Sequence, residues 1–167
     1  MEPLIKNKIK KNKSFIFIFS LLLGVLSSFA LPPYNYFIIN FFVYTSLFIF
    51  CNFLNGNKKH LFIFGLLFGF SYFFSNLYWI SNSLKFDDTF EFLIPVSLIL
   101  IPLSLSIFFG ISFLVLSFFR LNYNFSSILY FATVISFFEY LRGTILTAIP
   151  WNLTAFSLSE LNYSIQI

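Results

Sequence analysis

The sequence has few charged residues. Asp, Glu, Lys and Arg make up only 10% of its 167 residues, whereas a soluble domain carries about 25%. Hydrophobic residues account for 59%, and the mean hydropathy is +0.88. So little polar surface cannot cover a globule in water. The composition therefore excludes an ordinary soluble domain and predicts a protein that crosses a membrane several times.

Cysteine and histidine occur once each, as Cys51 and His60. A single cysteine cannot form a disulfide within the chain, and neither residue has neighbours that would complete a metal site. We expect Cys51 to be a small buried hydrophobic residue and His60 to lie in a solvated loop. The sequence also has no glycine-rich phosphate loop and no Ser/His/Asp or Cys/His set. It therefore predicts no metal, no cofactor and no nucleophile with an adjacent base.

Five apolar runs are separated by short polar segments. They cover residues 15–31, 36–54, 61–81, 92–119 and 125–141. A helix needs about 20 residues to cross a bilayer, so the runs predict an all-α membrane protein with about five transmembrane helices. The residues divide into a basic N-terminus, 1–14, and a membrane domain, 15–167. The basic start followed by an apolar run also fits a cleavable signal peptide, but the further spans favour a membrane anchor.

Positive charges gather on alternate sides of the predicted spans. If the N-terminus is cytoplasmic, that side holds eight of the ten Lys and Arg residues: Lys6, Lys8, Lys10, Lys11, Lys13, Lys58, Lys59 and Arg120. The other side holds Lys85 and Arg142. This bias predicts a cytoplasmic N-terminus and a periplasmic C-terminus. The formal charge of +4 is thus a topology signal, and we expect no nucleic-acid partner. We expect segment 83–91, with its three acidic residues, to be a solvated polar loop.

One stretch, residues 139–152, places ionisable groups at the end of the fifth apolar run. Glu139 and Arg142 are three residues apart, so they share a helix face and can pair. Ionisable groups at membrane depth face a protein interior or a water-filled cavity. Two roles fit this pattern: a structural ion pair that locks the helix end, and a polar anchor beside a lipid or substrate cleft.

Aromatic residues mark the same predicted side of the membrane. Pro150, Trp151 and Asn152 follow Arg142 after a short connector. Trp151 fits either the aromatic belt at the membrane interface or an irregular element at the mouth of an active site. Tyr78 and Trp79 end the third span, where they form a belt pair or share a site with Trp151.

The third span also carries a small-xxx-small pair, Gly65 and Gly69, with Asn76 on roughly the same face. Small residues let helix backbones approach, and an asparagine can hydrogen-bond across to a neighbouring helix. We interpret these three residues as helix-packing positions.

Several short motifs occur in a fixed order. They are Phe29-Ala-Leu-Pro-Pro-Tyr34, Gly69-Phe-Ser-Tyr-Phe73 with Leu77-Tyr-Trp-Ile80, Glu139-Tyr-Leu-Arg-Gly143, and Ile149-Pro-Trp-Asn-Leu153 with Phe156-Ser157. From about Phe15 onward, the chain resembles the N-terminal membrane region of bacterial apolipoprotein N-acyltransferases. The resemblance implies a multi-pass protein of the bacterial inner membrane. It makes Tyr78, Trp79, Glu139, Arg142, Pro150, Trp151 and Asn152 candidates for lipid or substrate contact.

The resemblance also implies a reaction. The family transfers an acyl chain from a phospholipid donor to the N-terminal diacylglyceryl-cysteine of a lipoprotein acceptor. Its fold joins eight membrane helices to a periplasmic nitrilase-like domain with a Glu-Lys-Cys triad, and Cys51 does not match that cysteine. Residues 162–167 resemble the start of the family's sixth helix, so we expect a truncated membrane domain that is inactive alone. The alternative is a non-catalytic membrane protein that binds lipid or scaffolds a partner. A transporter is less favoured, because no internal repeat is present.

Overall fold

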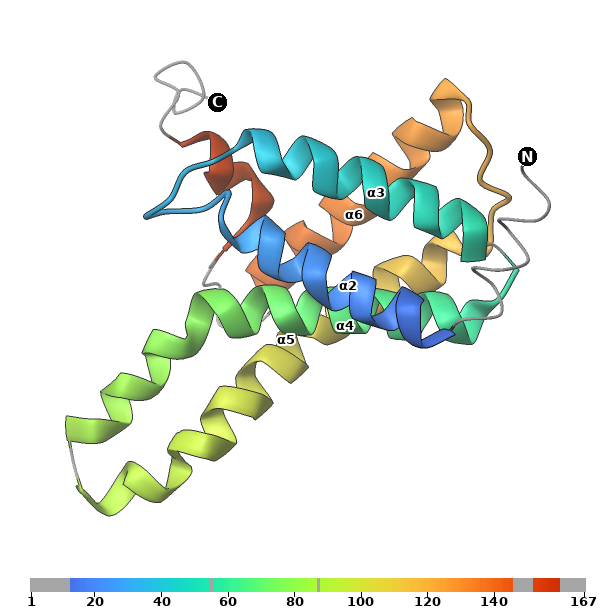
Figure 1. Ribbon diagram of the computed structural model, residues 1–167. Coiled ribbons are helices and arrows are strands. Elements are labelled where there is room, and N and C mark those ends of the chain that lie inside the picture. Colours follow the sequence, from blue (N-terminus) through green and yellow to red (C-terminus); the bar gives the residue numbers. More distant parts are fainter. Residues whose placement is uncertain (1–12, 55, 87, 146–151, 160–167) are drawn as a thin grey trace.

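The computed structural model describes residues 13–54, 56–86, 88–145 and 152–159, and every regular element in these ranges is a helix (Figure 1). In chain order they are α2 (Lys13–Ser28), α3 (Ile38–Leu54), α4 (Lys58–Leu77), η1 (Tyr78–Phe86), η2 (Asp88–Leu93), α5 (Ile94–Leu116), α6 (Phe125–Ile145) and η3 (Thr154–Leu158). Most of the basic N-terminus, residues 1–12, lies outside the described ranges.

Three helical segments are long and apolar enough to cross a membrane: Lys58–Phe86, Asp88–Leu116 and Phe125–Ile145. Two shorter apolar helices, Ser14–Ser28 and Ile38–Leu54, precede them. The prediction of an all-α membrane protein is therefore confirmed. The number of spans and their orientation stay predictions.

The polar loop expected over residues 83–91 is wrong. η1 and η2 are 3₁₀ helices that continue α4 and precede α5, and together they cover 78–86 and 88–93. The physical reason is that residues 78–93 contain no glycine or proline, the residues that most strongly interrupt a helix. The acidic side chains alone do not stop helix formation.

His60 also differs from the expectation of a solvated loop. It lies in the first turn of α4, where its backbone N–H donates to the side-chain oxygen of the N-cap residue Asn57 at 3.2 Å. Its ring stacks on Phe17 of α2, with 6.0 Å between ring centroids. The short connection between α3 and α4 leaves no room for a longer loop.

α4 is the central helix of the bundle, and α5 packs along it. A Cβ atom on Gly65 would lie 2.6 Å from the carbonyl oxygen of Phe109, and one on Gly69 would lie 3.0 Å from the Cα of Ser106. Both glycines therefore sit where the two backbones come closest. Asn76 instead donates to the carbonyl oxygen of Tyr72 in its own helix, at 2.8 Å, rather than across to another helix.

α2 crosses a neighbouring face of α4, again through small residues. A Cβ atom on Gly24 would lie 2.3 Å from the carbonyl oxygen of Phe68. Ser20 donates to the carbonyl oxygen of Phe64 at 2.5 Å. Phe64 and Phe68 are fully buried in the apolar core, to which all five helices from α2 to α6 contribute side chains.

α3 and α6 complete the bundle (Figure 1): α6 packs against α5, and α3 packs against α2. Cys51 is fully buried on α3. Phe48 of α3 meets Phe131 of α6 edge to face, with 5.6 Å between ring centroids. Beyond α6, the short helix η3 returns beside the first turns of α3. This return brings residues 152–154 into contact with α3, α4 and α6.

Candidate functional site: a buried polar clamp beside an apolar groove

The site centres on the segment 152–154. Asn152 has a φ of 52°, in the left-handed region that asparagine tolerates better than most residues. Leu153 is extended, with φ −69° and ψ 142°. The backbone therefore turns sharply at Asn152. Its carbonyl group and the N–H group of Thr154 meet polar side chains of the spans.

The carbonyl oxygen of Asn152 accepts two hydrogen bonds. The Tyr72 hydroxyl donates at 2.9 Å, and Arg142 Nη2 donates at 3.3 Å. The guanidinium carbon of Arg142 also lies 4.9 Å from the ring centroid of Phe73, within range of a cation–π interaction. Tyr72 and Arg142 are each only 2% exposed. A buried cation in a membrane protein requires such partners. The hydrogen bond therefore stabilises the buried charge of Arg142 and also fixes the position of the segment 152–154.

Glu139 binds the same segment one helical turn earlier. Its Oε1 atom accepts from the backbone N–H of Thr154 at 3.3 Å and from the Thr154 hydroxyl. The Thr154 Oγ1 atom also lies 2.5 Å from the Tyr44 hydroxyl. A hydroxyl group has one proton to donate. Because Thr154 gives its proton to Glu139, the Tyr44 hydroxyl is the donor to Thr154. A chain of hydrogen bonds therefore links α3, η3 and α6.

We call the four side chains that grip the segment 152–154 the clamp: Tyr44, Tyr72, Glu139 and Arg142. Glu139 and Arg142 also interact electrostatically. The sequence predicts only that the two charged residues pair on one face of a helix. In the structure, both side chains also bind the segment 152–154, which connects them. Both roles considered from the sequence remain compatible with this geometry.

An apolar groove begins at the clamp and runs between α3 and α6. One part is a cavity of about 540 Å³, lined by Phe41, Tyr44, Thr45, Phe48, Ile128, Phe131, Ala132, Ile135, Ser136, Glu139 and Thr154. A second part of about 400 Å³ is lined by Phe37, Asn40, Phe41, Tyr44, Ser136, Glu139, Thr154, Ala155, Ser157 and Leu158. The two parts share Phe41, Tyr44, Ser136, Glu139 and Thr154, so they form one groove.

The groove has a polar end and an apolar end. At its polar end lie Tyr44 and Glu139 of the clamp, and Phe48, Ile128 and Phe131 line its apolar end. The lining residues run from Phe37, which immediately precedes α3, to Phe48, and from Ile128 to Glu139 on α6, so each row covers eleven residue steps. At 1.5 Å per residue this is about 16 Å, close to half of the roughly 30 Å hydrocarbon core of a bilayer. The groove therefore has the length of one leaflet.

The sequence-predicted site residues fall into three groups. Glu139, Arg142 and the backbone of Asn152 meet in the clamp. Tyr78 and Trp79 begin η1, where both side chains are exposed and take no part in the clamp. Pro150 and Trp151 lie outside the described residues.

Three residues of the site are missed by sequence reasoning: Tyr44, Tyr72 and Thr154. Tyr44 and Tyr72 each place a hydroxyl inside an apolar run, a signal that is hard to separate from an ordinary aromatic core residue. Thr154 acts through its backbone as well as its hydroxyl, which no side-chain pattern shows.

An all-α bundle with three helices able to cross a membrane, a buried polar clamp and an adjoining apolar groove defines an integral membrane protein. The family described as apolipoprotein N-acyltransferase N-terminal domain matches residues 23–167. The chain belongs to this family.

Curated relatives agree with that assignment. An apolipoprotein N-acyltransferase of Rickettsia prowazekii is 36% identical over 149 residues, which cover 86% of this chain and 29% of the relative. One from Rhodopseudomonas palustris is 32% identical over 150 residues, covering 86% of this chain and 27% of the relative. One from Allorhizobium ampelinum is 31% identical over 140 residues, covering 77% and 26%. The chain thus spans between a quarter and a third of the length of these relatives.

Proposed function

We propose that this chain is the membrane portion of an apolipoprotein N-acyltransferase of the bacterial inner membrane. The complete enzyme would transfer an acyl chain from a phospholipid to the N-terminal diacylglyceryl-cysteine of a lipoprotein. Membership of the family supports this proposal, as do the names of the relatives. The fold adds a site of suitable chemistry, because acyl chains need an apolar channel with a polar end.

Glu139 is the residue that carries the proposal. Its carboxylate lines both parts of the groove, and in the part of the chain that the structure describes, the hydrogen bonds it accepts are at Oε1. Oε2 is then available to a hydrogen-bond donor on a lipid in the groove. An ionisable group kept at membrane depth beside a cavity is a candidate functional group. We propose that the groove holds one acyl chain and that the clamp fixes the polar end of that lipid.

The chain's own residues supply lipid binding rather than the nucleophile. A thioester route needs a thiol activated by an adjacent base. The single thiol of this sequence, Cys51, is fully buried in the apolar core, on α3 and away from the clamp. The family resemblance assigns the nucleophile to a separate periplasmic domain. Tyr78, Trp79, Pro150, Trp151 and Asn152 stay candidates for lipid contact on the basis of the resemblance alone.

A chimaera tests the proposal. Residues 23–167 would replace the matched N-terminal region of the Rickettsia prowazekii relative, in cells whose own N-acyltransferase has been depleted. Mass spectrometry of a reporter lipoprotein separates the diacylated from the N-acylated form. We expect the chimaera to restore N-acylation. A chimaera that inserts in the membrane at normal abundance and leaves the lipoprotein diacylated would overturn the proposal.

A matched pair of substitutions then tests the groove. Ser136→Trp fills the groove where its two parts join, and Thr133→Trp places the same side chain on an exposed position of α6 that lines neither part. In the chimaera, Ser136→Trp should lower N-acylation at least tenfold at equal abundance, while Thr133→Trp should leave it within twofold. Equal activity of the two variants would show that the groove does not carry substrate.

A further inference from the structure

The segment formed by η1 and η2, residues 78–86 and 88–93, extends α4 and α5 away from α2, α3 and α6 (Figure 1). We call it the arm. Each leg of the hairpin, Lys58–Phe86 and Asp88–Leu116, has 29 residues. An α-helix rises 1.5 Å per residue and a 3₁₀ helix about 2.0 Å, so each leg is about 45–50 Å long. The hydrocarbon core is only about 30 Å thick. The arm therefore either projects into water or leans along the membrane.

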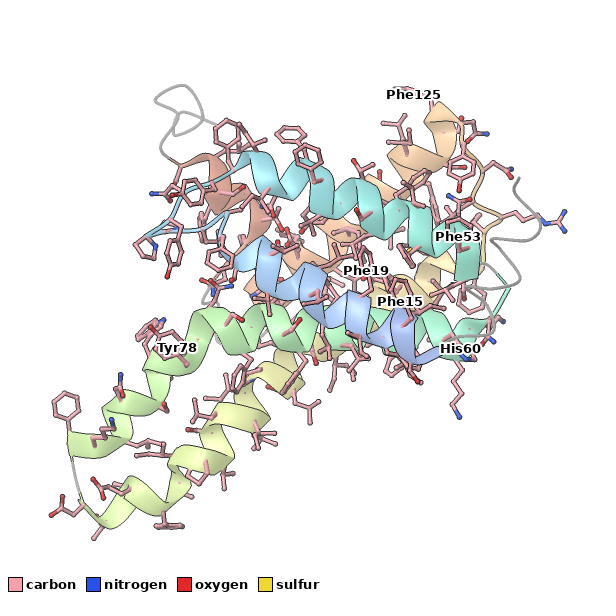
Figure 2. All side chains as sticks on the ribbon, viewed as in Figure 1. Phe15, Phe19, Phe53, His60, Tyr78 and Phe125 are labelled. Atoms are coloured by element: carbon pink, nitrogen blue, oxygen red, sulfur yellow. The ribbon has the colours of Figure 1, made fainter. Side chains whose placement is uncertain are left out.

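The surface of the arm is rich in exposed aromatic rings. The exposed fractions are 60% for Tyr78, 53% for Trp79, 93% for Phe86, 50% for Phe90 and 71% for Phe92. Ser81 is the one buried residue of η1, and η2 has none among its described residues. Figure 2 shows Tyr78 at the start of the arm, on the side away from α5. So many exposed large apolar side chains in one short segment indicate an interaction site.

Charged residues are interleaved with these rings. Lys85, Asp88 and Glu91 are all exposed within the same short stretch. The cores of protein–protein interfaces are depleted of such charges, so the pattern disfavours a protein partner. Aromatic rings mixed with charged groups are typical of segments at the boundary between lipid headgroups and acyl chains.

The apolar surface of the arm continues that of the span. Val96, Ile99 and Leu100, at the start of α5, are large apolar side chains that the bundle leaves exposed, as expected of a helix that faces lipid. The surface therefore passes from α5 into the arm without a polar break longer than one turn. This continuity identifies lipid as the partner of the arm.

We propose that the arm lies in the headgroup–acyl boundary of the bilayer, at the end of the bundle that carries Arg142. Its aromatic rings enter the upper part of the acyl layer, and its charged side chains remain among the headgroups. Tyr72, which belongs to the clamp, and Phe73, which contacts Arg142, precede Tyr78 by less than two helical turns. The arm thus holds the lipids nearest to the clamp. This placement does not depend on the proposed reaction.

Tryptophan fluorescence tests the placement, because the sequence has two tryptophans, Trp79 and Trp151. Trp151→Phe leaves Trp79 as the sole emitter. The variant would be reconstituted in phosphatidylcholine vesicles that contain phospholipids brominated at a series of depths. We expect a blue-shifted emission, strongest quenching by bromine near the headgroup end of the acyl chain, and iodide quenching at least threefold weaker than for free tryptophan.

Two further proteins keep the test decisive if Trp151→Phe folds poorly. The spectrum of Trp79→Phe, subtracted from that of the unmodified chain, gives the contribution of Trp79 without altering Trp151. Phe86→Trp, in a chain that lacks both natural tryptophans, reports on the tip of the arm. Strong iodide quenching without bromine quenching would place the arm in water. Quenching by neither agent would show that protein covers it, and strongest quenching by bromine at the chain end would place it in the hydrocarbon core. Each of these three results would overturn the proposal.

Discussion

Tyr72 and Arg142 donate hydrogen bonds to the same carbonyl oxygen, that of Asn152. They reach it from different helices, α4 and α6, and both side chains are almost completely buried. The bonds fix a backbone segment that lies outside the regular spans against the core of the bundle. Irregular backbone at membrane depth is tolerated only where protein or water satisfies it, and these two residues provide that satisfaction.

Removing the Tyr72 hydroxyl should loosen this segment without disturbing the core. Tyr72→Phe keeps the ring and loses one hydrogen bond, so we expect the free energy of unfolding to fall by about 1 kcal/mol. Tyr36→Phe makes the same chemical change on an exposed ring and should leave stability unchanged. Unfolding of both variants by denaturing detergent in mixed micelles measures the difference. If Tyr72→Phe and the unmodified chain have the same free energy of unfolding, this hydrogen bond does not stabilise the fold.

A double-mutant cycle at Glu139 and Arg142 separates structural from functional roles. Arg142→Met removes the cation near the Glu139 carboxylate, and Glu139→Gln leaves Arg142 with the Asn152 carbonyl and the Phe73 ring but without the Glu139 charge. The cost of removing one charge from a direct buried pair, about 3–5 kcal/mol, is an upper bound for these two charges, which meet through the segment 152–154, and each single variant should reduce folded protein in the membrane. The double variant should partly restore it. The measurements are membrane abundance of the chain and, in the chimaera, N-acylation activity.

The same cycle has a different outcome if the pair serves substrate. Single variants would then fold normally and lose activity, and the double variant would stay inactive. Normal abundance together with normal activity in both single variants would contradict either role. It would mean that residues 139–142 are merely a solvated helix end, contrary to the burial of Arg142.

Much of the fold follows from the sequence for a simple physical reason. Five apolar runs and their polar breaks give helices whose positions agree with α2 to α6, because backbone groups in lipid must be satisfied within a helix. The prediction of a loop at 83–91 is wrong because it rests on the polar side chains alone. This segment contains no glycine or proline that would interrupt the helix. Polar side chains indicate that a segment is exposed to water, whereas glycine and proline indicate that its helix is interrupted.

The site was predictable only in part. Glu139 and Arg142 stand out because charge is rare in a span. Their hydrogen-bond partners include the Asn152 carbonyl and the Thr154 N–H group. Every residue other than proline has these backbone groups, so a pattern of side chains cannot predict which ones take part. The left-handed turn at Asn152 suits asparagine, but asparagine also occurs in many other conformations, so its presence does not predict the turn. The groove depends on how α3 and α6 pack, which composition does not encode.

Topology is the next prediction. The distribution of Lys and Arg predicts five spans with a cytoplasmic N-terminus. Reporter fusions after Lys59, Asp88 and Ser159 should therefore give cytoplasmic, periplasmic and periplasmic signals, respectively. The fusion after Lys59 serves as the internal control for orientation. A cytoplasmic signal at Ser159 would refute the five-span arrangement and move the clamp to the other membrane surface.

The chain alone should have no N-acyltransferase activity, because its only thiol is buried without an activating base. Purified chain would be incubated with phospholipid and a synthetic diacylglyceryl peptide, and the product followed by mass spectrometry. We expect no acyl transfer above a protein-free control. If transfer is seen, Cys51→Ser decides whether that thiol takes part, and loss of activity in this variant would contradict the assignment of Cys51 to the core.

The central claim is that the groove between α3 and α6 holds an acyl chain whose polar end meets Glu139. Photo-crosslinking tests it most directly. A phospholipid with a diazirine in one acyl chain would be added to the reconstituted protein, irradiated, and its attachment sites mapped by mass spectrometry. The account predicts adducts on groove residues such as Phe41, Phe48 and Phe131, which Ser136→Trp abolishes and Thr133→Trp preserves. Adducts spread evenly over the exposed faces of all helices, unchanged by Ser136→Trp, would contradict it.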